Sequence, residues 1–324
     1  MKYRVLDLFS GIGGFSLAFK SIASTVAYCD IDPNSRDVLM SNIQKGLLDD
    51  ATIFNDVTKI NRHDLEHLKP NMITAGFPCT DISAANPTGQ GLKGKHSGLF
   101  KHIIRIIDEI PSVQIVFLEN SPRILKKGFS TVKKQMQNRG FSVKYIIVSA
   151  KDVGALHKRL RWYCLCTRSN PPLPLIHERF YQYPWDNANK VKRLLHVNLE
   201  KKKMAHIRCQ LLGNTIVPQC AMVAWNTLCD SSGKKFIIEH HLPLDITISD
   251  GILTYQKRYW ATPCRAIWHN YRSLTKRGST VLSNQLYYDK RTTIDHKSIH
   301  TAEYIANPIF VESLMGYPKN WTKI

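Results

Sequence analysis

The first 168 residues alternate between strand-like and helix-like segments, and this alternation constrains the fold more than any other feature. Short runs rich in aliphatic and aromatic residues predict strands, and longer segments between them predict helices. The expected strands are 3–8, 25–30, 51–55, 72–75, 115–119, 141–148 and 163–167, and the expected helices are 15–21, 35–43, 99–110 and 131–139. Repeated strand–helix alternation is typical of an α/β fold with a doubly wound, mainly parallel sheet.

The composition and the patterning of the chain change after this region. Several prolines fall within 171–174, a basic and weakly periodic stretch runs to residue 203, and an apolar helix is expected at about 216–228. Residues 231–235 have the composition of a linker, and 236–324 carry Tyr, Trp, Lys and Arg in short alternating runs. We therefore expect a catalytic domain at 1–230 and a smaller β-rich module at 236–324.

The charge balance indicates a polyanionic partner. Lys and Arg total 45 against 25 acidic residues, which gives a net charge of +20. Such an excess favours nucleic acid over a membrane surface, and no apolar run approaches the length of a membrane helix. The eight cysteines form no Cys-x-x-Cys pair, so we expect reduced thiols and no metal site. A strand at the very start predicts no signal peptide, and we expect an intracellular protein, cytoplasmic or nuclear.

Polar or permissive residues follow several of the predicted strands. The segment 7–14, Asp30, Asp56, Cys79 and Glu119 all lie at or just after a predicted strand end. In doubly wound sheets, ligands bind outside the carboxyl ends of the strands. The sequence therefore predicts a site at one edge of the sheet.

The segment Asp7-Leu-Phe-Ser-Gly-Ile-Gly-Gly14 is expected to be a ligand-binding loop. Its glycines allow the backbone to approach a ligand closely at the start of a helix. Asp30 then ends the next strand, where a carboxylate can bind ribose hydroxyls. Ser16 occupies the place of the third glycine of the dinucleotide fingerprint, so adenosine without a pyrophosphate fits better than NAD.

Each candidate also has a purely structural interpretation. A lone cysteine such as Cys79 is more often a buried residue of the core than an activated nucleophile. Glu119 alone would be a surface carboxylate at a strand end, and Arg159 and Arg161 would form a solvated face. Asn214 would be a helix cap, and Asp30 and Asp56 would form turns. Only the joint arrangement of these residues argues for a functional site.

In their order along the chain, these motifs resemble those of the cytosine-5 DNA methyltransferase family. The resemblance covers residues 1 to about 225 and rests on the segments 7–14, 29–33, 55–57, 76–79 (the nucleophile motif), 119–123 (the Glu-Asn motif), 157–161 (the Arg-rich motif) and 213–219 (the Gly-Asn motif). It implies S-adenosylmethionine as cofactor and double-stranded DNA as partner. The cofactor-binding residues that it implies are Asp7, Phe9, Ser10, Gly11, Gly13, Gly14, Asp30, Ile31, Asp56, Val57, Pro78 and Asn214.

Within this set the resemblance implies specific roles. Asp30 would bind the ribose, Ile31 would lie on the adenine, and Asp56 would lie toward the adenine amino group. Asn214 would lie near the methionine end of the cofactor. The implied catalytic residues are Cys79, Glu119, Arg159 and Arg161. Carbon 5 of cytosine is too weak a nucleophile to attack a sulfonium methyl group, and a thiolate that adds at carbon 6 would convert the ring to a reactive enamine.

The other catalytic residues would support this addition. Glu119 would interact with the ring nitrogen and the exocyclic amine, and donating a proton would require it to be buried. Arg161 would hold the carbonyl oxygen of the base, and Arg159 would orient Glu119 or the thiolate. The target base would have to be extruded from the duplex. Lys93 and Lys95, and basic residues of the tail such as Lys257 and Arg258, are candidate phosphate contacts.

The chain departs from the family pattern in three places. Thr80 follows the cysteine where Gln is usual, and His157 replaces another Gln. Typical family members have their target-recognition region between the Arg-rich and Gly-Asn motifs, but only a short segment separates these motifs here. We therefore assign target recognition to 236–324, with 170–210 as the competing assignment. The alternatives are an RNA cytosine-5 methyltransferase and a catalytically inactive DNA-binding relative, with a nicotinamide oxidoreductase least favoured. We expect a monomer from a restriction system, phage or virus.

Overall fold

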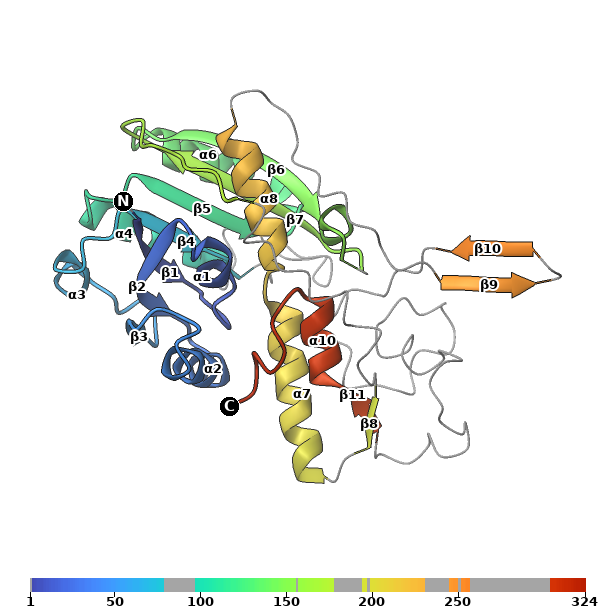
Figure 1. Cartoon of the computed structure of the whole chain (residues 1–324). Coiled ribbons are helices and arrows are strands. Elements are labelled where there is room, and N and C mark those ends of the chain that lie inside the picture. Colours follow the sequence, from blue (N-terminus) through green and yellow to red (C-terminus); the bar gives the residue numbers. More distant parts are fainter. Residues whose placement is uncertain are drawn as a thin grey trace. The chain divides into compact units, whose positions relative to one another are not determined.

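The structure is a computed structural model that describes residues 2–78, 97–155, 157–177, 194–196, 199–230, 245–249, 252–256 and 304–324 (Figure 1). The chain forms two compact units. Unit 1 contains Met1–Ser149, Leu160–Tyr181 and Pro218–Ile237, and unit 2 contains Ala150–Arg159, Gln182–Val217 and Ile238–Ile324. Among the described helices, none is long and apolar enough to cross a lipid bilayer.

Unit 1 is built on a seven-stranded sheet with the strand order β3-β2-β1-β4-β5-β7-β6. Five of its strands are parallel: β1 (Tyr3–Leu8), β2 (Ala23–Cys29), β3 (Thr52–Phe54), β4 (Met72–Ala75) and β5 (Ile115–Asn120). The strand β7 (Leu160–Thr167) runs antiparallel between β5 and β6 (Ser142–Ser149). The predicted α/β fold with a mainly parallel sheet is confirmed.

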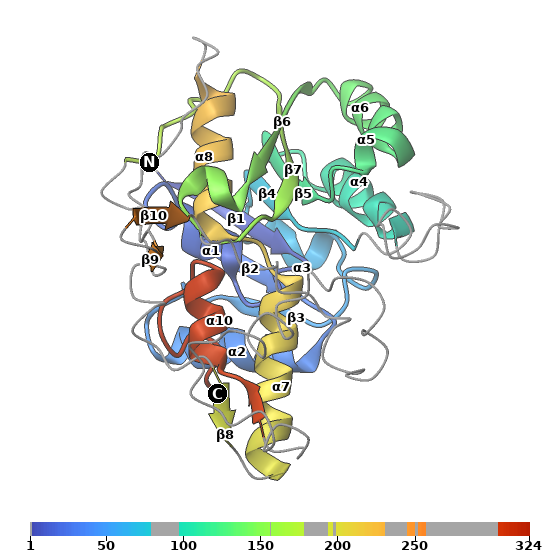
Figure 2. The same ribbon diagram turned by 90° about the vertical axis from the view of Figure 1, so that its right-hand side faces the viewer.

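Helices cover both faces of this sheet. They are α1 (Gly14–Phe19), α2 (Pro33–Gln44), α3 (Arg62–Glu66), α4 (Phe100–Glu109), α5 (Ile124–Lys127), α6 (Phe129–Gln137) and α8 (Pro218–Cys229). Figure 2 shows α8 on one side of the strands and α4, α5 and α6 on the other. A helix on each face leaves the strands buried on both sides, which explains their continuous apolar runs.

The two faces have different cores. On the side of α1 and α8, the rings of Phe19, Phe117 and Trp225 pack together with centroids 5.3–5.7 Å apart. On the other side, Ile103 and Ile106 of α4 are fully buried. Such burial of large apolar side chains is the main favourable contribution to folding, at about 1.5–3 kcal/mol for each side chain.

Local signals in the sequence explain where two of the helices begin. Asp32 caps α2 by accepting a hydrogen bond from the backbone amide of Asn34 at 2.9 Å, and Pro33 is the first residue of this helix. Asn61 and Asp64 form a reciprocal capping box at the start of α3, a helix that the sequence analysis did not predict. Both arrangements satisfy backbone amides that a helix leaves without partners.

Unit 2 contains α7 (Leu199–Asn214) and α10 (Pro308–Leu314), which pack against each other. The strands β8 (Leu194–His196) and β11 (Tyr304–Ala306) pair in antiparallel fashion, as do β9 (Asp245–Ser249) and β10 (Ile252–Gln256). Short 3₁₀ turns occur at Ser97–Leu99 in unit 1 and Ala150–Val153 in unit 2. The assignment of catalysis to 1–230 and of recognition to 236–324 stays a prediction.

Candidate functional site

The loop between β1 and α1 has the tight backbone that its glycines predict. Gly11 and Gly13 have φ values of +52° and +83°, and Phe9 has a φ of +55°. A Cβ atom on Gly13 would lie 2.8 Å from Cδ1 of Leu48, and the positive φ at Gly13 would strain any L side chain, so glycine is favoured there. A positive φ at a phenylalanine is uncommon, and such backbone strain concentrates at functional sites.

Asp30 follows β2, and its carboxylate is hydrogen-bonded to this loop. Its Oδ2 accepts a hydrogen bond from the backbone amide of Gly11 at 2.7 Å, and its Oδ1 accepts one from Asp32 at 2.9 Å. Burial raises the pKa of Asp30. The neighbouring Ile31 is 76% exposed, the highest value among the large apolar residues that the structure describes. A fixed carboxylate beside an exposed apolar surface suits a nucleoside, which presents hydroxyl groups and an apolar ring.

Asp7 lies underneath the loop, where its side chain is fully buried. It accepts hydrogen bonds from Thr74 Oγ1 at 2.7 Å and from Ser16 Oγ at 3.1 Å, and Thr25 in turn donates to Ser16 at 2.8 Å. Burial raises the pKa of Asp7 to about 7. Asp7 thus ties α1 to β4, and its direct contact with a cofactor stays a prediction.

The other predicted cofactor residues of unit 1 lie close to strand ends. Ser10 is buried and donates to the carbonyl oxygen of Asp7 at 2.5 Å, and Gly14 begins α1. Asp56 forms a turn in which its Oδ1 accepts from the amide of Thr58 at 2.9 Å, and Val57 is buried. The turn is the structural interpretation of Asp56, and its contact with the adenine amino group stays a prediction.

Glu119 and Arg161 form an ion pair at the carboxyl edge of the sheet. The Nε atom of Arg161 lies 2.9 Å from Oε1 of Glu119, and the two side chains are 26% and 12% exposed. The pair forms because β7 runs antiparallel to β5, which places the start of β7 beside the end of β5. The sequence analysis expected Arg159 to orient Glu119 or the thiolate, whereas Arg161 makes this described contact.

The segment that leads to Cys79 packs against the same edge. The side-chain amide of Asn120 donates to the carbonyl oxygen of Phe77 at 3.1 Å, and a Cβ atom on Gly76 would lie 3.3 Å from Oε2 of Glu119. The structure therefore brings the Glu-Asn motif and the beginning of the nucleophile motif together. Pro78 is described, whereas Cys79, Thr80, Lys93, Lys95, Lys257 and Arg258 lie outside the described residues.

Arg159 and Asn214 lie in unit 2. The guanidinium group of Arg159 is buried and donates to the carbonyl oxygens of Gly213 at 3.2 Å and Thr215 at 2.6 Å. These two carbonyl groups flank Asn214, whose side chain is exposed. His157, which departs from the family pattern, is fully buried. Arg159 therefore fixes the backbone on both sides of a predicted cofactor residue.

Several described cysteines are poor candidates for the nucleophile. Burial raises the pKa of Cys29 and Cys229 to about 12, and it raises the pKa of Cys209 as well. Such thiols stay protonated near neutral pH, and the thiolate is the reactive form. The Sγ atoms of Cys164 and Cys166 lie 3.7 Å apart, because residues two apart in a strand share one face.

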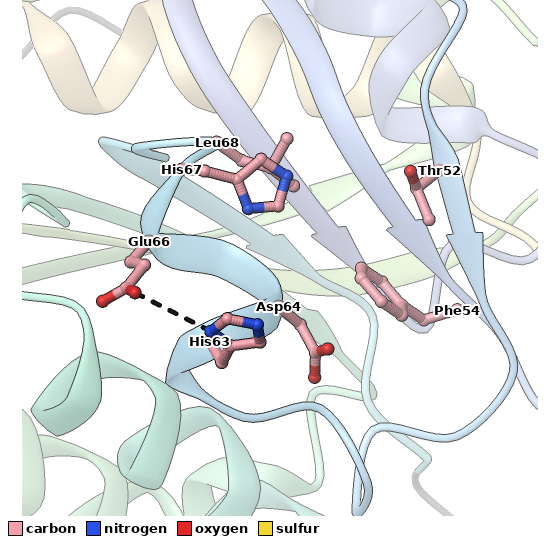
Figure 3. Close-up of a pocket in the computed structure, with 7 residues that line it drawn as sticks. All are labelled: Thr52, Phe54, His63, Asp64, Glu66, His67 and Leu68. Atoms are coloured by element: carbon pink, nitrogen blue, oxygen red, sulfur yellow. Dashed lines mark ion pairs between the residues drawn. The ribbon is translucent and has the colours of Figure 1, made fainter.

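A separate hollow of about 520 Å³ lies beside the edge strand β3, and the predicted site residues do not line it (Figure 3). Its lining includes Thr52, Phe54, His63, Glu66 and His67. His63 and Glu66 are 3.9 Å apart, but His63 is almost fully exposed. Among the described residues, no three His, Cys, Asp or Glu side chains are grouped so that they could hold a metal ion.

The sequence analysis gave no role to two residues that shape the site. Asn120 belongs to the quoted Glu-Asn motif, and its position next to Glu119 was the available signal. Thr74 precedes the nucleophile motif and lies in a strand that reads as apolar. A hydroxyl within an apolar strand is itself a signal, because buried polar groups need hydrogen-bond partners.

Comparison with known proteins gives consistent results. The family model described as C-5 cytosine-specific DNA methylase matches residues 3–322. The Type II methyltransferase M.CviJI of Paramecium bursaria Chlorella virus IL3A is 33% identical over 231 residues, which cover 70% of this chain and 60% of that protein. The Type II methyltransferase M.HhaI of Haemophilus parahaemolyticus is 30% identical over 186 residues, covering 56% of this chain and 52% of M.HhaI.

Solved structures are also similar. The S. pombe Dnmt2 methyltransferase superposes with a TM-score of 0.44 at 21% sequence identity, and 59% of each chain is covered. The chain spans between about half and three-fifths of the length of the two curated relatives named above.

Proposed function

Because the chain belongs to the C-5 cytosine-specific DNA methylase family, we propose that it methylates carbon 5 of cytosine in double-stranded DNA, with S-adenosylmethionine as the cofactor. The observation that best supports this proposal is the arrangement at the carboxyl edge of the sheet in unit 1. There Glu119 is paired with Arg161, and Asn120 holds the segment that leads to Cys79. A candidate acid–base group and the start of the segment that carries the proposed nucleophile therefore lie at one edge of the sheet, which supports this reaction.

The residues of the β1–α1 loop and the end of β2 fit the proposed cofactor. When bound, S-adenosylmethionine supplies an electrophilic methyl group on a sulfonium centre. Gly11 and Gly13 permit close approach of the backbone, and the carboxylate of Asp30 accepts hydrogen bonds from ribose hydroxyls. Ile31 offers its exposed apolar side chain to the adenine ring. Asn214 contacts the methionine end.

The proposed chemistry begins at Cys79. Its thiolate adds to carbon 6 of the cytosine, and the ring electrons move to carbon 5. Carbon 5 then bonds to the methyl carbon as the carbon–sulfur bond of the donor breaks. A base, assigned to water, removes the proton from carbon 5, and the thiolate leaves carbon 6 to restore the aromatic ring. Glu119 holds the ring nitrogen and amine, and Arg161 holds the carbonyl oxygen.

Access to the thiolate requires that the cytosine leave the duplex. Extrusion costs a few kcal/mol, and contacts between basic side chains and phosphates offset that cost. The net charge of +20 supports this role. We assign target recognition to 236–324, with 170–210 as the competing assignment. We further propose a monomer that acts in the cytoplasm or nucleus, in a restriction system, phage or virus.

The experiment that tests the proposal follows methyl transfer and the covalent adduct together. The full chain is incubated with labelled S-adenosylmethionine and genomic DNA, and in parallel with a library of duplexes of varied sequence that contain 5-fluorocytosine. We expect methylated cytosine in the DNA and, from the library, a trapped adduct on the peptide that contains Cys79. Cys79→Ser should abolish turnover and leave DNA binding unchanged.

Cys229→Ser is the matched control, because its half-buried thiol lies outside the predicted site, and it should keep full activity. An adduct on another cysteine would contradict the proposed mechanism. Methyl transfer to RNA without transfer to DNA would contradict the proposed substrate.

A further inference from the structure

Asn214 is an exposed residue within a buried segment. It ends α7, and its neighbours Leu212, Gly213, Thr215 and Ile216 are all buried. A single polar side chain that reaches the surface from a packed segment can hold a fixed direction only if the backbone beside it is fixed. The contacts of the flanking backbone therefore decide where Asn214 points.

Two side chains from distant parts of the sequence fix that backbone. Arg159 donates to the carbonyl oxygens of Gly213 and Thr215. On the other side, the hydroxyl group of Tyr317 lies 2.6 Å from Oγ1 of Thr215 and donates to the carbonyl oxygen of Ile216 at 3.2 Å. All of these groups are buried and belong to unit 2.

The C-terminal segment that carries Tyr317 is itself held firmly. The carboxylate of Glu312 is fully buried and accepts hydrogen bonds from Arg208 Nη2 at 2.9 Å, from the amide of Asn320 at 2.7 Å and from the amide of Thr322 at 2.8 Å. The ring of Trp321 packs 5.7 Å from that of Tyr317. Buried charges with this many partners keep their positions, because any shift would leave a charge unpaired.

We propose that Tyr317 is a positioning residue for the cofactor: it holds the 213–217 segment so that Asn214 keeps the orientation needed to contact the methionine end of S-adenosylmethionine. This inference rests on the proposed function, which assigns that contact to Asn214. It gives the C-terminal segment 307–324 a role on the cofactor side of the reaction. That role is distinct from the target recognition that is assigned to 236–324 as a whole.

The test compares Tyr317→Phe with the unchanged protein by calorimetric titration of S-adenosylmethionine and S-adenosylhomocysteine into the full chain without DNA. Loss of the hydroxyl group should weaken the binding of either ligand by roughly 2- to 10-fold, because the backbone beside Asn214 would be held less firmly. In steady-state kinetics the KM for the donor should rise by a similar factor. The kcat at saturating donor and the dissociation constant for duplex DNA should stay unchanged.

Thr215→Val removes the same hydroxyl contact from the other side. It should weaken donor binding by a similar factor, and the double variant should lose less affinity than the product of the two single losses, because both changes break one interaction. Asn214→Ala should weaken donor binding at least as much. Tyr3→Phe is the matched control, since it removes a tyrosine hydroxyl bond to the carbonyl oxygen of Pro172 in unit 1, and its donor affinity should match that of the unchanged protein.

The possible results separate the inference from the function on which it rests. Unchanged donor affinity in Tyr317→Phe, or a loss of DNA affinity alone, would overturn the inference. So would a loss in Tyr317→Phe accompanied by none in Asn214→Ala. If the unchanged protein binds no S-adenosylmethionine, the proposed function fails as well. Thermal unfolding of each variant identifies any loss that comes from misfolding, and Thr215→Val then carries the test if Tyr317→Phe does not fold.

Discussion

Asn120 donates a hydrogen bond through its side-chain amide to the carbonyl oxygen of Phe77 at 3.1 Å. Asn120 ends β5 and Phe77 follows β4, so the bond joins the ends of two neighbouring parallel strands. Glu119 lies close to the same segment, since a Cβ atom on Gly76 would lie 3.3 Å from Oε2 of Glu119. The bond thereby fixes the chain two residues before Cys79.

We predict that Asn120→Ala lowers kcat by about 10- to 100-fold, because loss of the bond leaves a buried carbonyl group without its partner at a cost of about 1–3 kcal/mol. The dissociation constant for S-adenosylmethionine should stay the same, since the β1–α1 loop and Asp30 are untouched. Pre-steady-state methyl transfer, combined with calorimetry, measures both quantities. Asn138→Ala, an exposed change at the end of α6, should alter neither. A normal kcat in a folded Asn120→Ala protein would contradict the prediction.

The second prediction concerns the pH dependence of stability. Burial raises the pKa of Asp7 to about 7 from an ordinary value of 3.8. The folded state therefore keeps a proton that the unfolded state loses as pH rises between these values, and the free energy of unfolding falls as pH increases through this window. At about 1.4 kcal/mol per pKa unit, the contribution of Asp7 falls by up to about 4 kcal/mol.

Asp7→Asn should remove this part of the slope, because an amide does not titrate. Urea unfolding at several values between pH 4 and 8 measures the difference between the variant and the unchanged protein. Asp50→Asn alters an exposed aspartate and should leave the slope as it is. If Asp7→Asn and the unchanged protein have parallel pH profiles, Asp7 does not titrate in this window.

The third prediction concerns cofactor affinity and pH. Burial raises the pKa of Asp30, so its carboxylate takes up a proton at a higher pH than an ordinary aspartate does. A protonated group no longer accepts two ribose hydroxyl bonds as an anion, and affinity for S-adenosylmethionine should fall as pH is lowered through that range. Asp30→Asn should bind the donor roughly tenfold more weakly, in line with the strength of hydrogen bonds to charged groups.

The affinity of Asp30→Asn should also be independent of pH over the range in which the affinity of the unchanged protein falls. Calorimetric titrations of the donor at pH 5, 6, 7 and 8 give the profile. Asp37→Asn changes an exposed residue of α2 and should reproduce the unchanged profile. A pH-dependent loss that persists in Asp30→Asn would assign the titration to another group.

Local patterns predicted the sheet of unit 1 well. The strands 3–8 and 72–75 have the expected bounds, and the other predicted strands differ by a few residues at one or both ends. The predicted helix at 216–228 is α8, Pro218–Cys229. These strands and helices pack against other apolar elements, and their own sequences therefore contain apolar runs or an apolar periodicity. Such patterns can be recognised from the sequence alone.

The helices of unit 2 were harder to predict, and the reason is visible in one ion pair. Arg208 of α7 pairs with Glu312 of α10, and Glu312 is fully buried. Two charged residues that are buried together read as surface residues in a sequence, and the sequence analysis predicted no helix over the residues of α7, of which the basic stretch that ends at 203 covered only the beginning. The expectation of a β-rich module at 236–324 likewise missed α10.

The contacts within the site depend on strand register, which the sequence does not report. Arg161 reaches Glu119 because β7 pairs antiparallel with β5, whereas local patterns give neither the direction nor the register of a strand. The burial of Asp7 also follows from packing, because Thr74 and Ser16 approach it from different elements. Sequence motifs located the edge of the sheet, and tertiary pairing decides which side chains meet there.

The backbone amides of Gly11 and Asp32 donate hydrogen bonds to the carboxylate of Asp30, and these bonds affect how a ligand binds there. Both oxygens already have their directions set before any nucleoside arrives. A nucleoside that binds at Asp30 therefore meets a carboxylate that is already oriented, and this group has little rotational freedom left to lose.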